Sequence, residues 1–476
     1  MEISFFKRQI EKAMEGRWDY GYNNERDNTD EKGCLTMNHD LTEGNVTKSL
    51  LMFAGPMILG NLLQQCYNIA DTWVVGKYVG AQALAAVGSS YALMTFLNSL
   101  LIGLCMGGGA VFSYYIGKKD RHKVRACALT AFVMIGGLAV ALCVAVQCLI
   151  HPILWVLRTP GELYEMTRAY LAIIFWGIFF IFLYNYFAFL LRALGNSVAP
   201  LYFLGAASVL NIGLDLYFVR GLGLGLKGAA AATVISQILS GLGLGIYLWR
   251  KEPYFRFSLR GFLREEKPVG EICSYSLMTC MQQSVMNFGI LMVQSLVNSF
   301  GAAVMAAFAA TVKIDTFAYM PAQEFGNAYS IFISQNHGAG KRERVTQGTK
   351  RAMGVSAAFC GAVSVLVCGL ARYLMMIFVE AGETQIIEIG VTYLRIEGAF
   401  YIGIGILFLL YGYFRGINRP GISLVLTVIS LGTRVALAYT LAAVPQIGVL
   451  GIWWAIPIGW ALADVTGFVL MGRKRE

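Results

Sequence analysis

The sequence predicts an all-α integral membrane protein of twelve spanning helices, arranged as two pseudo-symmetric six-helix lobes around a central cavity. Three observations predict this fold: the composition, the spacing of apolar stretches and an internal repeat. Of the 476 residues, 57% are hydrophobic and 14% are charged, and the mean hydropathy is +0.59. A soluble domain has about 25% charged residues. Lipid must therefore be the solvent for much of the chain.

A spanning helix needs about 20 predominantly apolar residues. Pro56 in the first span and Pro321 in the eighth lie mid-helix, where each removes a backbone donor and predicts a hinge. Twelve stretches are long and apolar enough to span, at about residues 47–75, 84–115, 126–149, 163–191, 198–219, 228–249, 268–298, 305–336, 352–376, 386–414, 420–440 and 447–471.

The connections between spans alternate in charge. Segments 116–125, 250–267 and 338–351 carry five, six and five Lys or Arg residues, whereas segments 76–83, 151–162 and 299–304 carry one, one and none. By the positive-inside rule, the basic connections and both termini are cytoplasmic. The net charge of +10 therefore indicates loops beside membrane lipid rather than a nucleic-acid partner.

These spans define the expected domains. A cytoplasmic tail at 1–46, which we expect to be disordered, precedes an N-terminal lobe at 47–249. A cytoplasmic linker at 250–267 leads to a C-terminal lobe at 268–471 and a short tail at 472–476. Met37 is an alternative start of the chain.

The second half of the chain repeats the first. At an offset of 221 residues, Gly80-Ala81 matches Gly301-Ala302 and Gly117 matches Gly338. With two more residues inserted, the matching pairs are Tyr170 and Tyr393, Arg192 and Arg415, Gly225 and Gly448, and Gly228 and Gly451. Six spans per copy make the repeat parallel, about an axis along the membrane normal. This architecture favours alternating-access transport over a channel.

Other function classes lack the motifs they need. The ten cysteines are scattered without a CxxC pair, and the four histidines form no ligand cluster. The sequence contains no phosphate-binding GxxxxGK[ST] loop. Because no nucleophile–base pair or metal-ligand group is present either, we expect neither an enzyme nor a cofactor. An ion gradient is the expected energy source.

Two carboxylates at membrane depth form the candidate coupling site. Asp71 ends a stripe on the first helix that also contains Asn61, Gln64 and Asn68, and Asn211 and Asp215 share a face of the fifth helix. Burial disfavours the charged form of a carboxyl group, and a second carboxylate nearby adds to this effect. Such a pair could hold a proton or a Na⁺. The alternative for Asp71 is a hydrogen bond near a helix end, because Gly76 and Lys77 follow closely.

The repeat places apolar residues opposite this pair, with Met292 opposite Asp71 and Val435 or Ala438 opposite Asp215. The sequence therefore predicts an acid pair in the N-terminal lobe alone. Gln64, Asn68, Gln283, Asn287 and Glu324 are predicted to line the substrate cavity, where Glu324 would attract cations. Gln283 and Asn287 could equally hydrogen-bond between helices. No role is predicted for Lys313, Asp315, Arg395, Glu397, Arg434 or Asp464.

At these residues the chain resembles the multidrug and toxic compound extrusion (MATE) transporters. The motifs are LTEGNVTKSLLMFAGPMILGNLLQQCYNIADTWVVGKYVGAQALAAVGSS (41–90), FLLRALGNSVAP (189–200), VKIDTFAYMPAQEFGNAYSIFISQNHGAGK (312–341) and FRGINRP (414–420). The bacterial DinF-like branch is the most similar. Its cation site implies a role for Asp71, Asn185, Asn211, Asp215 and Thr233, with Na⁺ held at Asp71, Asn211, Asp215 and Thr233. Other branches use acids in the seventh and tenth helices, where this chain offers only Gln282 and Gln283, and Glu388 and Glu397.

The resemblance implies secondary active multidrug efflux, in which small, mostly cationic and amphipathic compounds leave in exchange for H⁺ or Na⁺. The alternative is a flippase or exporter of lipid-linked or polysaccharide precursors, which would be favoured by a strongly cationic cavity. We expect a monomer in the bacterial cytoplasmic membrane, with drug-like substrates and lipid as its partners. The choice between H⁺ and Na⁺ stays open.

Overall fold

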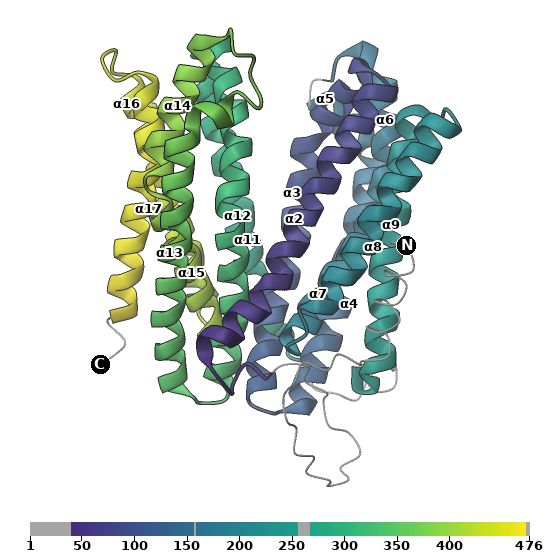
Figure 1. Ribbon diagram of the computed structural model, residues 1–476. Coiled ribbons are helices and arrows are strands. Elements are labelled where there is room, and N and C mark those ends of the chain that lie inside the picture. The colour runs from purple at the N-terminus through teal and green to yellow at the C-terminus, as the bar shows by residue number, and fades with distance from the viewer. Residues whose placement is uncertain (1–39, 157–158, 256–266, 473–476) are drawn as a thin grey trace, which may run out of the picture. The chain divides into compact units, whose positions relative to one another are not determined.

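A computed structural model describes residues 40–156, 159–255 and 267–472, and these residues form helices without any strand (Figure 1). Residues 1–39 of the expected N-terminal tail, with Met37, lie outside the described residues. The same holds for residues 256–266 of the expected linker and 473–476 of the C-terminal tail.

The helices of the N-terminal half follow the predicted spans. Two spans contain a change of helix type: α6 continues through a short 3₁₀ turn into α7, and α8 continues into a stretch of π-helix. The elements are α2 (Val46–Tyr78), α3 (Ala81–Gly117), α4 (Arg121–Cys148), α5 (Ile150–Val156), α6 (Gly161–Ile174), η1 (Phe175–Gly177), α7 (Ile178–Ala193), α8 (Val198–Asp215), η2 (Leu216–Gly221), α9 (Gly225–Lys251) and η3 (Pro253–Phe255).

The C-terminal half has the same order of spans. Its fourth span is broken between α14 and α15, which differ in direction by 51°. The elements are α11 (Val269–Asn298), α12 (Ala302–Gly338), α13 (Arg342–Met375), α14 (Thr384–Gly398), α15 (Tyr401–Gly416), α16 (Pro420–Ala442) and α17 (Val449–Gly472). This break and the 3₁₀ turn at η1 occupy equivalent places in the repeat.

Ten helices of the described chain are long and apolar enough to cross a membrane, or eleven if the bent pair α14–α15 is one span. The helix α11 occupies the place of the remaining predicted span. It is 30 residues long but carries Gln282, Gln283 and Asn287, which lower its hydropathy. The predicted all-α membrane fold is confirmed, and α11 is less apolar than the other spans.

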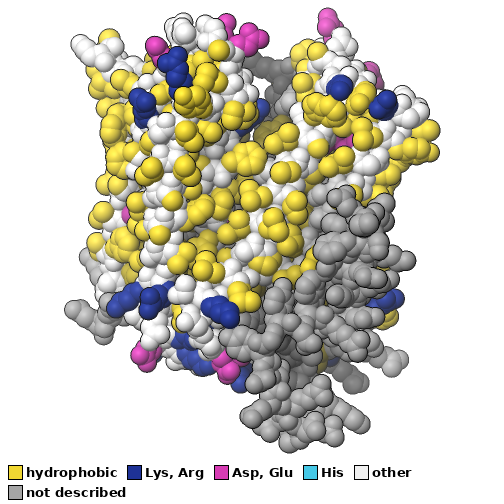
Figure 2. Space-filling view, viewed as in Figure 1, with side chains coloured by type: hydrophobic (Ala, Val, Ile, Leu, Met, Phe, Trp, Pro, Cys, Tyr) yellow, Lys and Arg dark blue, Asp and Glu magenta, His cyan; other side chains and the backbone are white. Residues whose placement is uncertain are grey.

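Large apolar side chains are exposed along the helices. On α13, for example, Val365 is 75% exposed and Tyr373 is 67% exposed. On the face drawn in Figure 2, hydrophobic side chains cover the middle of the helices, and Lys and Arg side chains gather near the helix ends. Exposed apolar area on this scale indicates contact with lipid.

The chain forms two compact units. The first unit contains Leu63–Ser89 and the described residues of Phe132–Glu266, and the second contains Leu41–Leu62, Ser90–Ala131 and the described residues of Lys267–Glu476. In the first unit a core cluster joins the end of α2 to α3 and α9 through residues such as Val75, Ala86 and Ala229. The lobe boundaries expected from the sequence stay a prediction.

The backbone supports the duplication. Eight residues that pair by the repeat offsets all adopt left-handed backbone angles, although the residue types differ in two of the four pairs. The pairs are Gly80 (φ 107°) and Gly301 (94°), Lys119 (59°) and Gly340 (72°), Gly195 (82°) and Asn418 (64°), and Gly225 (56°) and Gly448 (53°). The turns between helices are therefore conserved between the copies even where glycine is not.

A reciprocal contact within the second unit joins the two copies. A Cβ on Gly117 of α3 would meet the carbonyl oxygen of Gln335 on α12, and a Cβ on Gly338 of α12 would meet the carbonyl oxygen of Tyr114 on α3. Gly338 is the repeat partner of Gly117, and Gln335 is the partner of Tyr114. Such a self-complementary contact is what a two-fold axis produces.

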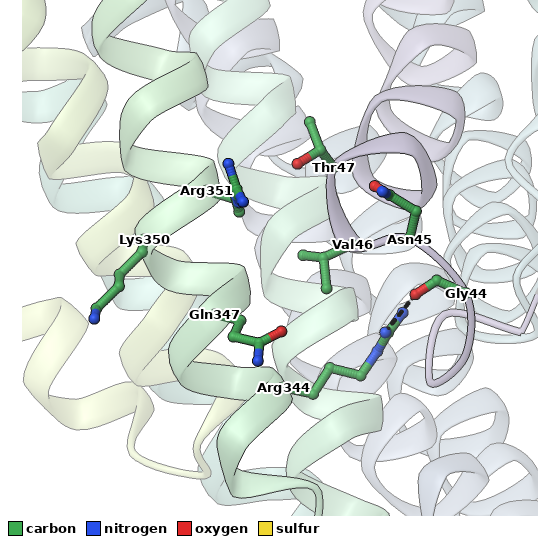
Figure 3. Close-up of a pocket in the computed structure, with 8 residues that line it drawn as sticks. All are labelled: Gly44, Asn45, Val46, Thr47, Arg344, Gln347, Lys350 and Arg351. Carbon is green, nitrogen blue, oxygen red and sulfur yellow. Dashed lines mark hydrogen bonds between the residues drawn. The ribbon is translucent and has the colours of Figure 1, made fainter.

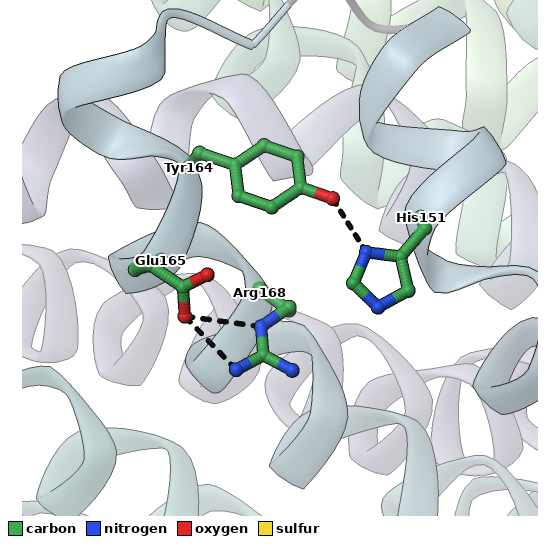
Figure 4. Close-up of polar contacts among 4 residues, drawn as sticks. All are labelled: His151, Tyr164, Glu165 and Arg168. Carbon is green, nitrogen blue, oxygen red and sulfur yellow. Dashed lines mark hydrogen bonds and ion pairs between the residues drawn. The ribbon is translucent and has the colours of Figure 1, made fainter.

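Local contacts fix the short helix α5 in the first unit. The Nδ1 atom of His151 lies 2.6 Å from the hydroxyl of Tyr164 on α6, and the two rings stack (Figure 4). Beside them, the Arg168 guanidinium donates to the Glu165 carboxylate in an exposed ion pair. Exposed pairs of this kind contribute little stability.

The predicted hinges lie inside unbroken helices. Pro56 is inside α2 and Pro321 is inside α12. Their role as hinges stays a prediction.

Candidate functional site

The predicted acid pair lies within the first unit. Asp71 is on α2, and Asp215 is the last residue of α8 and fully buried. The two carboxyl groups act on each other electrostatically and are therefore neighbours. The π-helix of η2 begins directly after Asp215, and such wide turns often occur at functional sites.

Several polar atoms of this pair have no protein partner. Within the described residues, no hydrogen bond reaches Oδ1 of Asp71, either carboxylate oxygen of Asp215, or either amide atom of Asn211, all of which are buried. Asn211 is 1% exposed and lies one helical turn before Asp215. Buried polar atoms are normally paired, so this group of oxygens is suited to a ligand.

Two tyrosines surround the acid pair, and neither was predicted from the sequence as a site residue. Tyr67 on α2 and Tyr170 on α6 each interact electrostatically with Asp71 and Asp215. The side chain of Gln64 contacts Tyr67. The recurrence of Tyr170 as Tyr393 in the repeat was the signal that could have identified Tyr170.

Asn185 and Thr233 lie on helices that pack beside α8. Asn185 of α7 donates to the carbonyl of Ile181 at 2.9 Å, and Thr233 of α9 donates to the carbonyl of Ala229 at 3.1 Å. Helix α9 packs against both α7 and α8. These bonds use only the donors, so the amide oxygen of Asn185 and the hydroxyl oxygen of Thr233 keep lone pairs for a cation.

The donor set fits a hard cation. Carboxylate, amide and hydroxyl oxygens are the ligands that such cations prefer, and three of the four residues predicted for Na⁺ have unpartnered buried oxygens. Groups of three or more His, Cys, Asp or Glu side chains that could hold a metal are absent from the described part of the chain.

The residues predicted for the substrate cavity are divided between the units. In the first unit Gln64 and Asn68 lie on an exposed face of α2, and Asn68 donates to Gln65 at 3.3 Å. In the second unit Gln283 and Asn287 are half-buried on α11, and the amide of Gln283 lies 3.9 Å from the sulfur of Met106. Their convergence on one cavity stays a prediction.

Glu324 is half-buried on α12 and belongs to a polar network. Its Oε1 accepts from Asn61 at 3.0 Å and from Asn327 at 3.3 Å. The buried Arg415 donates to the oxygen of Asn327 at 3.0 Å and acts electrostatically on Glu324. This counter-charge was not predicted from the sequence. Through Asn327 it holds the carboxylate in place.

A cavity of about 800 Å³ lies in the second unit, between the N-terminus of α2 and α13 (Figure 3). Arg344 donates to the carbonyl of Gly44 at 2.7 Å and fixes the turn before α2. None of the predicted substrate-site residues lines this cavity. Its lining is polar and basic: Gly44, Asn45, Val46, Thr47, Arg344, Gln347, Lys350 and Arg351.

The second unit contains an acid pair that the sequence did not predict. Asp315 on α12 and Glu397 on α14 are 2% and 3% exposed and act on each other electrostatically. The expectation of an acid pair in the N-terminal lobe alone is therefore wrong. It compared only the positions opposite Asp71 and Asp215, whereas this pair comes from other helices of the second copy.

Fold and site together define a class, the polytopic membrane transporters built from a duplicated six-helix unit. The family model described as MatE matches residues 56–217 and 276–440. The chain belongs to this family, the MATE transporters, as the motifs predicted. Its assignment to the DinF-like branch stays a prediction.

Known proteins match most of the chain. It is 32% identical over 393 residues to the probable multidrug resistance protein YpnP of Bacillus subtilis (strain 168). The aligned residues cover 82% of this chain and 87% of YpnP. The chain is 27% identical over 418 residues to the probable multidrug resistance protein NorM of Thermotoga maritima, covering 86% and 88% of the two chains. A solved structure described as the outward-facing conformation of a multidrug resistance MATE family transporter superposes with a TM-score of 0.86 and 25% identity, covering 94% and 98%.

Proposed function

We propose that this protein exports small, mostly cationic and amphipathic organic compounds in exchange for H⁺ or Na⁺ by alternating access. Membership of a transporter family and relatives named as multidrug resistance proteins support the transport class. The coupling ion enters at Asp71 and Asp215.

One observation carries the coupling proposal: the buried carboxyl pair has oxygens that no described residue satisfies. A buried carboxylate without a partner is costly. Neutralisation by an incoming H⁺ or Na⁺ therefore favours one conformation, and release toward the cytoplasm favours the other. Asp71, Asn211, Asp215 and Thr233 would hold the Na⁺, and Asn185 would add an amide oxygen.

The substrate class rests on Glu324. A half-buried carboxylate held by Asn61 and Asn327 provides a fixed negative charge for a cationic compound. We further propose a monomer in the bacterial cytoplasmic membrane, with both termini and the basic connections in the cytoplasm.

Ethidium uptake into everted membrane vesicles tests the coupling. A pH gradient and a Na⁺ gradient are imposed separately on wild-type protein and on Asp71→Asn, Asp215→Asn and Glu165→Gln. Glu165 is the matched control, because its carboxylate lies in the same unit but is 74% exposed. We expect uptake driven by one of the gradients to be lost in both Asp variants and kept in the control.

Equal expression and monodisperse elution from a sizing column would establish that the Asp variants are folded. Near-normal accumulation of ethidium by both folded variants would remove this pair from the coupling mechanism. Wild-type uptake that neither gradient drives would refute the exchange mechanism itself.

A further inference from the structure

The cavity between the N-terminus of α2 and α13 is not used by the proposed transport mechanism. Its volume of about 800 Å³ lies within the range of roughly 300–1,000 Å³ that is usual for small-molecule sites. Three of the residues that line it are cationic, Arg344, Lys350 and Arg351, and none is acidic. The acids Glu43 and Glu343 are exposed and lie outside the lining. The lining therefore favours an anion.

The three cations of the lining differ in their contacts. Arg344 donates to the carbonyls of Glu43 and Gly44 and so forms a fixed wall beside the turn before α2. Among the described residues, none forms a hydrogen bond or an ion pair with Lys350 or Arg351. Figure 3 shows the Arg351 side chain in the space between α13 and α2, whereas Lys350 extends away from α2. Arg351 is thus the cation placed to bind a ligand, and the flexible stem of Lys350 lets it reach the same ligand from the rim.

Helix α2 provides neutral donors on the opposite wall. The side-chain oxygen of Asn45 accepts from the backbone N–H of Lys48 at 3.1 Å, so the amide NH₂ group of Asn45 is left for a ligand. Thr47 adds a half-buried hydroxyl to the lining. Guanidinium, ammonium, amide and hydroxyl donors together suit the several acceptor oxygens of a phosphate group.

Apolar side chains follow the cavity along both helices. One helical turn beyond Thr47, Leu51 of α2 is 48% exposed. One turn beyond Arg351, Val355 of α13 is half-buried and packs on the core cluster that joins α2 to α12 and α13. Farther along α13, Phe359 is 39% exposed. A soluble phosphate compound needs no such surface, whereas the acyl chains of a phospholipid do.

The cavity lies where the apolar surface of the helices gives way to charge. On the face drawn in Figure 2, apolar side chains cover the middle of the helices, and Lys and Arg side chains gather near the helix ends. In the orientation proposed above, the start of α2 and the basic connection 338–351 are cytoplasmic. Basic pockets between spanning helices on that side of a membrane bind phospholipid headgroups, and anionic lipids are attracted to Lys and Arg there.

We propose that this cavity binds the phosphate headgroup of an anionic phospholipid from the cytoplasmic leaflet, with the acyl chains lying along Leu51 and Val355. Arg351 and Lys350 supply the charge, and Asn45 and Thr47 donate hydrogen bonds. Because the headgroup contacts both walls, the bound lipid holds the first turn of α2 against α13. The leaflet depends on the proposed orientation in the membrane, but the binding depends on neither the coupling ion nor the drug.

Thermal unfolding of the purified full-length protein in a neutral detergent tests the binding. Phosphatidylglycerol, phosphatidylcholine with the same acyl chains, and glycerol phosphate are added separately at equal concentration. Phosphatidylglycerol should raise Tm by several degrees more than phosphatidylcholine, whose choline group cancels the negative charge. Glycerol phosphate should have little effect, because it lacks the acyl chains. Native mass spectrometry should show one phosphatidylglycerol molecule retained under conditions that remove phosphatidylcholine.

Variants of the lining locate the site. Lys350→Gln/Arg351→Gln should weaken phosphatidylglycerol binding by about tenfold or more, because it removes charge-assisted hydrogen bonds. Both residues are exposed, so the fold should be kept. Arg342→Gln/Arg419→Gln is the matched control, since it removes two exposed cations of the same unit that lie outside the lining. Lys350→Arg/Arg351→Lys, which keeps both charges, should retain the preference for phosphatidylglycerol.

Each alternative has its own outcome. Equal stabilisation of the wild-type protein by the two lipids would refute an anionic headgroup site. A Tm rise from glycerol phosphate equal to that from phosphatidylglycerol would show a site for soluble phosphate compounds and refute the lipid. A preference for phosphatidylglycerol that survives Lys350→Gln/Arg351→Gln, or that is lost equally in Arg342→Gln/Arg419→Gln, would refute this cavity as its source. Failure of ion-driven ethidium uptake would leave all of these results unaffected.

Discussion

The reciprocal glycine contact between α3 and α12 allows a quantitative test of the pseudo-symmetry. In Gly338→Ala, the new Cβ would lie 2.0 Å from the carbonyl oxygen of Tyr114, where ordinary contact begins at 3.4 Å. The obstructing atom is backbone, so no side-chain rotation can relieve the clash. The two helices must separate by more than 1 Å, and overpacking of this kind costs about 1–3 kcal/mol.

Gly117→Ala should cost about the same, because its Cβ would lie 2.0 Å from the carbonyl oxygen of Gln335. The double variant should cost less than the sum of the two, since one separation of the helices accommodates both methyl groups. Gly354→Ala on α13 is the matched control, because no atom lies within 4 Å of its Cβ. There, replacing a helical glycine should stabilise the protein by up to about 1 kcal/mol.

The measurement is thermal stability in detergent. After heating, the fraction of protein that still elutes as a monodisperse peak from a sizing column gives the folded fraction. Gly338→Ala and Gly117→Ala should lower Tm by a few degrees each, and Gly354→Ala should leave it unchanged or higher. A Tm for Gly338→Ala equal to that of Gly354→Ala would refute the close approach of α3 and α12. Strictly additive losses would refute the shared contact.

Two other predictions follow from the described contacts. Glu324→Gln keeps an oxygen to accept from Asn61 but loses the charge, so export of cationic drugs should fall while export of neutral drugs is spared; equal loss of both would indicate a packing role. Lys119→Gly should raise Tm, because Lys119 holds a left-handed angle that costs a non-glycine residue roughly 1–2 kcal/mol and its repeat partner Gly340 is glycine. A lower Tm for Lys119→Gly would contradict this reasoning.

Local patterns accounted for much of the fold. Apolar length predicts a span without knowledge of its neighbours, so eleven of the predicted spans correspond to apolar helices or a bent helix pair. The spacing of four residues likewise placed Asn211 and Asp215 on one face. The polarity of α11 is visible in its sequence too, because Gln282, Gln283 and Asn287 interrupt its apolar residues.

Contacts between helices far apart in sequence could not be predicted in this way. The Asp315–Glu397 pair joins residues on α12 and α14, and neither helix has a pattern that indicates the other. Arg415 reaches Asn327 across 88 residues of sequence. In both cases the partner is decided by how helices pack, which depends on the shape of whole helix surfaces.

The sequence by itself thus determined the solvent of the chain, its helices, its duplication and the acids Asp71 and Asp215, because hydropathy and helical period act over a few residues. Only the tertiary structure decided which charges are compensated. It placed Tyr67 and Tyr170 around the first acid pair, Arg415 behind Glu324, and Arg434 beside Glu397. The physical reason is that electrostatic energy in a low-dielectric interior depends on distances of a few ångströms between side chains, and those distances arise from packing.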